Sequence, residues 1–121
     1  MQSADNKRRR LPTCVVADRD PDVLERLCDA LRHAPVAIVG TTIDGDDALR
    51  LAVRLRPAAA VVDVALPGRN GLEIARRLRS EAPATAVVLR SSARDDAARE
   101  RLSISCEIVP LRRNSSFIER Y

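Results

Sequence analysis

The stretch that decides the fold is VVDVALPGRNGLE, residues 61–73. It continues an apolar run that begins at Ala59 and is rich in β-branched residues, and the acidic Asp63 ends that run. Continuous apolar runs of this length are typical of strands that helices cover on both faces. A turn around Asn70 then precedes a segment of helical period. The stretch therefore predicts a strand, a loop and a helix, in this order.

The same alternation of strand and helix repeats along the whole chain. Between the apolar runs, apolar side chains recur at helical spacing, and Asp20, Pro21 and Asp44 stand where helices should begin. Repeated units of this kind predict a flavodoxin-like, doubly wound three-layer α/β sandwich around a parallel five-stranded sheet of order 2-1-3-4-5. The expected strands are Thr13–Ala17, Val36–Gly40, Ala59–Asp63, Thr85–Arg90 and Cys106–Val109.

Two acidic residues stand at the ends of neighbouring strands in this expected order. Asp18 ends the first strand and Asp63 ends the third. In doubly wound folds, ligands bind beyond the carboxyl ends of the strands, at the point where the winding direction reverses. We therefore expect the two carboxylates to face one another across that point.

Length and composition exclude several classes of protein. The 121 residues suffice for one domain and are too few for two. Apolar residues make up 45% and charged residues 31%, a balance typical of globular proteins, and no apolar run is long enough for a membrane span. The net charge of +4 comes with almost no aromatic residues, so we do not expect nucleic acid as a partner. We expect a flexible basic tail over residues 1–11 and a domain over 12–121.

The cysteines indicate a reducing compartment. Cys14, Cys28 and Cys106 are widely spaced and show no metal-binding pattern, so we expect them to behave as small apolar residues in the core. The basic N-terminus is not followed by the long apolar segment of a secretory signal. We therefore expect a cytoplasmic protein without membrane association.

Three stretches together resemble the receiver domain of bacterial two-component response regulators. The resemblance covers roughly residues 11–110. Residues 61–73 are similar to the family's segment around the phosphorylated aspartate, residues 16–21 to the acidic end of its first strand, and residues 43–49 to the start of its second helix. The resemblance implies a CheY-like fold and a role in phosphorelay signal transduction, with no enzymatic activity and no output domain of its own.

The same resemblance assigns roles to individual residues. It implies that Asp63 is the phosphoacceptor, and that Asp18, Asp20, Asp63 and the backbone carbonyl of Ala65 form an acidic pocket for Mg²⁺. Ser91 is the hydroxyl that would hold the phosphoryl group. The partner that it implies is a histidine kinase or a phosphotransfer protein, with a second copy of the chain as a further option.

The charges of the pocket depart from the family pattern in two places. Arg19 stands where the family has a second acid, and a guanidinium cannot bind a metal ion, so Mg²⁺ affinity should be weakened. The family's lysine before the proline of the fifth strand is replaced by Val109, and the only lysine in the chain is Lys7. Arg19 and Arg90 are candidate substitutes for the missing positive charge.

The C-terminal part of the sequence also departs from the family pattern. The segment between Ser91 and Pro110 is shorter than the family's spacing by about one helical turn, which predicts a shortened fourth helix. Phe117 and Tyr121 are the only aromatic residues, so the family's signalling aromatic on the last strand is absent. We expect the chain to close with a truncated C-terminal helix.

Two alternatives to a phosphorylated receiver remain open. In a pseudo-receiver, Arg19 or Arg90 would neutralise Asp63 permanently, and the protein would bind its partners independently of phosphorylation. The motif from Asp18 to Asp20 also resembles the nucleophile motif of haloacid dehalogenase-like phosphatases, a remote alternative because those enzymes need a downstream lysine and a cap domain. For Asp20 alone, capping of the following helix is an equally simple role.

Overall fold

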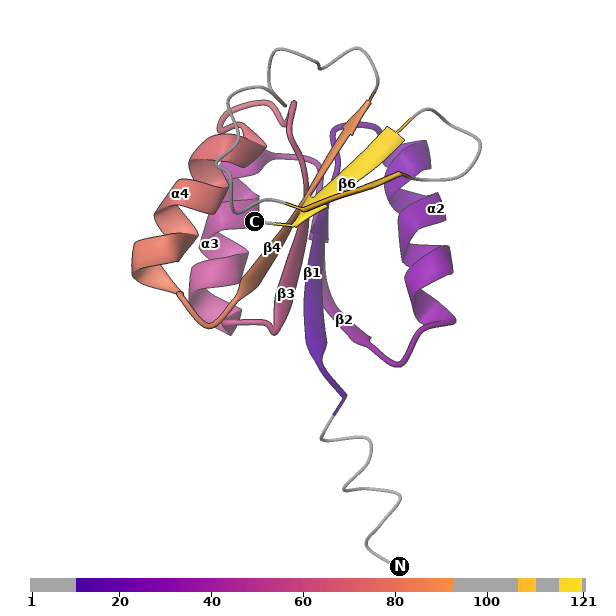
Figure 1. Cartoon of the computed structure of the whole chain (residues 1–121), viewed down its shortest axis with the longest axis horizontal. Coiled ribbons are helices and arrows are strands. Elements are labelled where there is room, and N and C mark those ends of the chain that lie inside the picture. The colour runs from indigo at the N-terminus through magenta and orange to yellow at the C-terminus, as the bar shows by residue number, and fades with distance from the viewer. Residues whose placement is uncertain (1–10, 93–106, 111–115, 121) are drawn as a thin grey trace, which may run out of the picture.

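Four parallel strands form the centre of the molecule (Figure 1). The computed structural model describes residues 11–92, 107–110 and 116–120. The first four strands lie in the order β2-β1-β3-β4, which confirms the predicted order 2-1-3-4 and the CheY-like α/β fold. The elements are β1 (Thr13–Ala17), α2 (Pro21–Arg32), β2 (Ala37–Thr42), α3 (Gly45–Leu55), β3 (Ala59–Asp63), α4 (Gly71–Glu81), β4 (Ala86–Ser92), β5 (Glu107–Pro110) and β6 (Ser116–Arg120).

The helices cover both faces of the sheet. In Figure 1, α2 lies on one side of the strands, and α3 and α4 lie together on the other. Each helix begins at the predicted residue, because the side chains of Asp20, Asp44 and Asn70 accept hydrogen bonds from backbone N–H groups of the first turn. Capping thus fixes where each helix leaves the carboxyl edge of the sheet.

Two hydrophobic clusters fill the space between the layers. The larger packs α3 and α4 against the sheet and includes Val62, Ile74 and Leu89. The smaller packs α2 against the other face around Cys14 and Cys28, which are buried free thiols as expected. Burial raises the pKa of both thiols above the ordinary value, which keeps them protonated and unreactive.

The sheet differs from the prediction beyond β4. There β6 pairs with β4 in antiparallel orientation, and β5 lies outside β6 at the edge, so the complete order is β2-β1-β3-β4-β6-β5. Antiparallel strands that are close in sequence need only a short connection, whereas a parallel neighbour needs a long crossover. Pro110 in β5 suits the edge position because proline has no N–H to donate to a further strand.

The C-terminal segment forms a strand where a helix was predicted. Residues Ser116–Arg120 form the strand β6, and Phe117 and Ile118 within it are residues of high strand propensity. The predicted tail up to residue 10, the shortened fourth helix and Cys106 lie outside the described residues. In the part of the chain that the structure describes, no helix has both the length and the apolar character needed to cross a membrane.

Candidate functional site: an acidic pocket paired with arginines

Asp18 and Asp63 lie side by side at the carboxyl edge of the sheet. Asp63 is the last residue of β3, and Asp18 directly follows β1, the strand next to it. The parallel register aligns Ala17 with Val62, so the next residue on each strand is one of the two acids. Both are buried, Asp18 with 1% and Asp63 with 3% of its surface exposed. The predicted meeting of the two carboxylates is therefore present.

Arg90 supplies a buried positive charge to this pair. It lies on β4 with its Cα aligned to that of Asp63, so it shares the carboxyl edge with both acids. Its Nη1 atom donates a hydrogen bond of 2.8 Å to Oδ2 of Asp18, and the side chains are only 11% and 2% exposed. Because both side chains are almost completely buried, water competes little with this ion pair.

Arg19 places a second guanidinium beside Asp63. Its backbone N–H donates to Oδ2 of Asp63 at 3.3 Å, and its side-chain Nε lies 3.6 Å from the same oxygen. The Arg19 side chain is about half exposed, so this ion pair is weaker than the buried one. Each predicted charge substitute thus contacts a different acid of the pocket.

The residues present do not fit a magnesium ion. Receiver domains typically bind Mg²⁺, which takes about six oxygen ligands in octahedral geometry. Here all four carboxylate oxygens of Asp18 and Asp63 already accept hydrogen bonds, from Arg90, Arg19 and the N–H groups of Asp20 and Ala65. Within residues 11–92, 107–110 and 116–120, no three His, Cys, Asp or Glu side chains are grouped so that they could hold a metal.

Asp20 caps the helix that follows it. Its carboxylate accepts hydrogen bonds from the N–H groups of Asp22 and Val23 in the first turn of α2. The side chain therefore stabilises the start of that helix. The backbone of Asp20 still contributes to the pocket, because its N–H donates to Oδ1 of Asp18 at 3.0 Å.

Ser91 is the next residue after Arg90 on β4. Its hydroxyl is fully buried and has no hydrogen-bond partner among the residues that the structure describes. Buried hydroxyl groups in folded proteins nearly always have a partner. Among the described residues, Ser91 therefore keeps an unused hydroxyl group beside the two acids of the pocket.

Burial dominates the titration of Asp18. Loss of water contact raises the pKa of this carboxyl above its ordinary value of 3.8, and the neighbouring negative charge of Asp63 acts in the same direction. The N–H of Asp20 and the guanidinium of Arg90 lower the pKa but do not cancel the effect of burial. The protonated form of Asp18 is thus favoured more in the folded than in the unfolded chain.

This raised pKa predicts how stability depends on pH. The stabilisation that protonation of Asp18 gives to the fold should be fully present below pH 3.8 and should be lost as the pH rises through the higher pKa of the folded state. Urea unfolding of the wild type and of Asp18→Asn, from below pH 3.8 upward, measures how the free energy of unfolding changes with pH. We expect the wild type to lose stability relative to Asp18→Asn as the pH rises. A constant difference between the two proteins, or one of opposite sign, would contradict this assignment.

The loop after β3 is braced by the start of α3. The N–H of Gly45 donates to the carbonyl of Pro67 at 2.8 Å, and Nε of Arg69 donates to Asp46 at 3.1 Å. Arg69 also lies 3.6 Å from Glu73 in α4. These contacts tie the backbone that follows Asp63 to two helices.

Sequence reasoning did not find these bracing contacts. In the sequence, the charges of Asp46, Arg69 and Glu73 look like those of ordinary solvated residues, and only the fold brings residues from two helices and a loop together. The signal that could have pointed to them is Gly45 beside Asp44, because a glycine at a helix start suggests a close approach of another backbone.

Comparison with known proteins agrees with the fold. The family model of the response regulator receiver domain matches residues 14–106. The signal receiver domain of the response regulator NarL from Mycobacterium tuberculosis is 34% identical with a TM-score of 0.62, and the match covers 64% of each chain. The chain thus spans less than two thirds of that NarL domain. A comparison with curated protein sequences gives no match.

Two further solved structures extend the likeness. The response regulator domain of CheB from Thermotoga maritima is 27% identical with a TM-score of 0.64, and the match covers 69% of this chain and 63% of that one. The REC domain of AraT from Geobacillus stearothermophilus has a TM-score of 0.70 at 23% identity over 78% of each chain, a likeness in fold. With the family model matching most of its length, the chain belongs to the receiver domain family of two-component response regulators.

Proposed function

We propose that this receiver domain is a pseudo-receiver, a signalling module that recognises its partner by protein–protein contact without being phosphorylated. The observation that carries the proposal is the buried ion pair between Arg90 and Asp18. It places a fixed positive charge on Asp18, the carboxylate that the resemblance to receiver domains assigns to metal binding. The partner we propose is a histidine kinase or phosphotransfer protein of a two-component system.

The charges of the pocket explain why phosphorylation is disfavoured. A carboxylate that attacks a phosphoryl donor meets another anion, so the reaction needs a cation placed on the phosphoryl oxygens. In this pocket the cations are guanidinium groups that already bind the carboxylates themselves, Arg90 on Asp18 and Arg19 on Asp63. Oδ2 of Asp63 is thus held by Arg19, and the residues that the structure describes include no lysine that could hold the product.

A second candidate function is phosphoryl acceptance at Asp63. The observation that favours it is the buried Ser91 hydroxyl, which has no partner within the described part of the chain and could donate to a phosphoryl oxygen. In this alternative, Arg19 would turn from the carboxylate to the incoming phosphoryl group. The two functions share the same residues, but they predict opposite results with a small phosphoryl donor.

Incubation with acetyl phosphate and Mg²⁺ separates them. We expect the intact mass of the wild type to show no phosphoryl adduct above the level of an Asp63→Asn control, because both carboxylates are already engaged. We also expect Mg²⁺ alone to leave the melting temperature unchanged, since an ion that does not bind cannot stabilise the fold. An adduct that Asp63→Asn lacks would establish the second candidate in place of the first.

A matched variant shows that the assay can detect metal binding. Arg19→Asp combined with Arg90→Leu removes both guanidinium groups and places a third carboxylate beside Asp18 and Asp63. Hard oxygen ligands of this kind suit Mg²⁺, so the melting temperature of the variant should rise with Mg²⁺ concentration. If the wild type responds to Mg²⁺ as strongly as this variant does, the arginines do not exclude the metal.

A further inference from the structure

The exposed apolar side chains of the domain gather at one edge. Among the described residues, the large apolar side chains with the greatest exposure are Val39 at 43%, Ile43 at 48% and Leu55 at 39%. Val39 belongs to β2, Ile43 directly follows it, and Leu55 ends α3, which packs against β2. Single exposed apolar residues are common on protein surfaces, but three on the edge strand, the residue after it and the helix packed against it are a sign of an interaction site.

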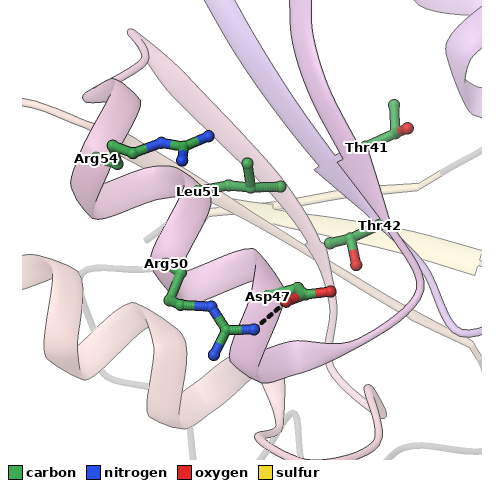
Figure 2. Close-up of a pocket in the computed structure, with 6 residues that line it drawn as sticks. All are labelled: Thr41, Thr42, Asp47, Arg50, Leu51 and Arg54. Atoms are coloured by element: carbon green, nitrogen blue, oxygen red, sulfur yellow. Dashed lines mark hydrogen bonds and ion pairs between the residues drawn. The ribbon is translucent and has the colours of Figure 1, made fainter.

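A hollow of about 450 Å³ opens at the same edge, between β2 and α3. Figure 2 shows Leu51 pointing from α3 toward the strand that carries Thr41 and Thr42. The Leu51 side chain lies against Gly40, where a Cβ atom would be 3.4 Å from its Cδ1. Leu51 therefore forms an apolar floor, and Thr42 and the arginines of α3 form a polar rim.

The rim of this hollow carries an uncompensated positive charge. Arg50 forms an ion pair with Asp47 one turn earlier on α3. For Arg54, the part of the chain that the structure describes offers no carboxylate at ion-pair distance. Arg54 also lines a second hollow of about 260 Å³ on the other side of α3, where Arg77 is paired with Glu81. Among the described residues, Arg54 is therefore the arginine that brings an unpaired positive charge to both hollows.

The outer edge of β2 is poorly suited to adding another strand. Its register with β1 shifts between Cys14 and Val15, which pair with Ile38 and Gly40, so Val39 is left out of the ladder. Such a bulge on an edge strand disrupts the regular row of N–H and C=O groups that strand addition requires. A partner would therefore bind here through side chains in the hollow.

We infer that the β2–α3 surface binds an acidic segment of a partner protein through one apolar side chain and one carboxylate. The β2–α3 surface consists of Val39, Thr41, Thr42, Leu51, Arg54 and Leu55. The apolar side chain enters the hollow above Leu51, and the carboxylate pairs with Arg54. This combination of apolar floor and single cation matches an acidic peptide better than a nucleic acid, which would need several cations and stacking aromatics.

This inference goes beyond the proposed function of the acidic pocket. The surface adjoins that pocket at Thr42, whose carbonyl accepts a hydrogen bond of 3.2 Å from the N–H of Asp18. Its binding groups nevertheless lie on β2 and α3, and none of them is Asp63 or Arg90. Binding here should therefore persist whether or not Asp63 is phosphorylated.

Selection from a phage-displayed library of random peptides tests the surface on the full chain. We expect the selected peptides to be rich in Asp and Glu and to share one large apolar residue. Arg54→Glu should weaken the binding of a selected peptide, measured by fluorescence anisotropy, by about tenfold, because the cation becomes an anion. Arg26→Glu makes the same change of charge on α2, on the other side of the sheet, and should leave the affinity unchanged.

The other outcomes each overturn the inference. Equal losses for Arg54→Glu and Arg26→Glu would show attraction by net charge alone. Failure to enrich acidic peptides would show that the surface has no such partner. Competition by duplex DNA would show that it binds nucleic acid, and self-association that Arg54→Glu abolishes would show that it binds a second copy of the chain. Asp63→Asn should bind the peptides like the wild type, so this test can fail independently of the phosphorylation test.

Discussion

Replacing Asp18 with alanine is expected to lower the free energy of unfolding by about 3–5 kcal/mol, the usual cost of breaking a buried ion pair from one side. The Arg90 side chain is only 11% exposed and would lose the carboxylate 2.8 Å from its Nη1 atom. A guanidinium cannot shed its charge at any practical pH, so the buried cation stays without this counter-charge. Urea unfolding at neutral pH measures the loss.

Two variants separate this effect from ordinary truncation. Asp18→Ala combined with Arg90→Met removes both charges and should recover most of the lost stability, because apolar groups often replace a buried ion pair at little cost. Asp29→Ala breaks the ion pair with Arg32 on α2, where both side chains are mostly exposed, and should cost less than about 1 kcal/mol. A loss for Asp18→Ala no greater than that for Asp29→Ala would mean that the pocket is open to water.

The parallel part of the fold could be predicted because its signals are local. Continuous Val- and Ile-rich runs mark buried strands, and the acceptor side chains of Asp20, Asp44 and Asn70 mark the helix starts, each within a few residues. Strand order then follows from the handedness of short crossovers. The strands beyond β4 carry no such local signals. Residues Ser116–Arg120 are few enough to form either a short helix or a strand, and only their pairing with β4 decides between the two.

For the pocket, the types of residue were predictable but their pairing was not. Asp18 and Asp63 had to meet once β1 and β3 were neighbours, and this needed only the strand order. Which acid each arginine contacts depends on the register of β3 and β4, which aligns Arg90 with Asp63 yet lets the long side chain reach Asp18. The length of the Arg90 side chain therefore decides which acid it contacts, and the spacing of residues in the sequence does not show this.

Gly45→Ala is expected to lower the free energy of unfolding by about 3 kcal/mol, near the upper end of the usual cost of overpacking. A Cβ atom at Gly45 would lie 1.7 Å from the carbonyl oxygen of Arg69 and within 2.8 Å of its backbone nitrogen. These are backbone atoms of the loop that follows Asp63, so no rotation of a side chain can relieve the clash. The loop must move, and the hydrogen bond from Gly45 to Pro67 would be lost with it.

Gly40→Ala is the matched control, because it adds the same methyl group at a place with room for it. Its Cβ would meet only the ends of the flexible Leu51 and Leu55 side chains, at 3.4 Å and beyond, so stability should change by less than about 1 kcal/mol. Amide chemical shifts give a second readout. In Gly45→Ala, the amide of Ala65 should shift, since it donates to Oδ1 of Asp63 at 3.0 Å and lies on the displaced loop. If both variants are equally stable, the start of α3 does not brace this loop, and the position of Asp63 depends on β3 alone.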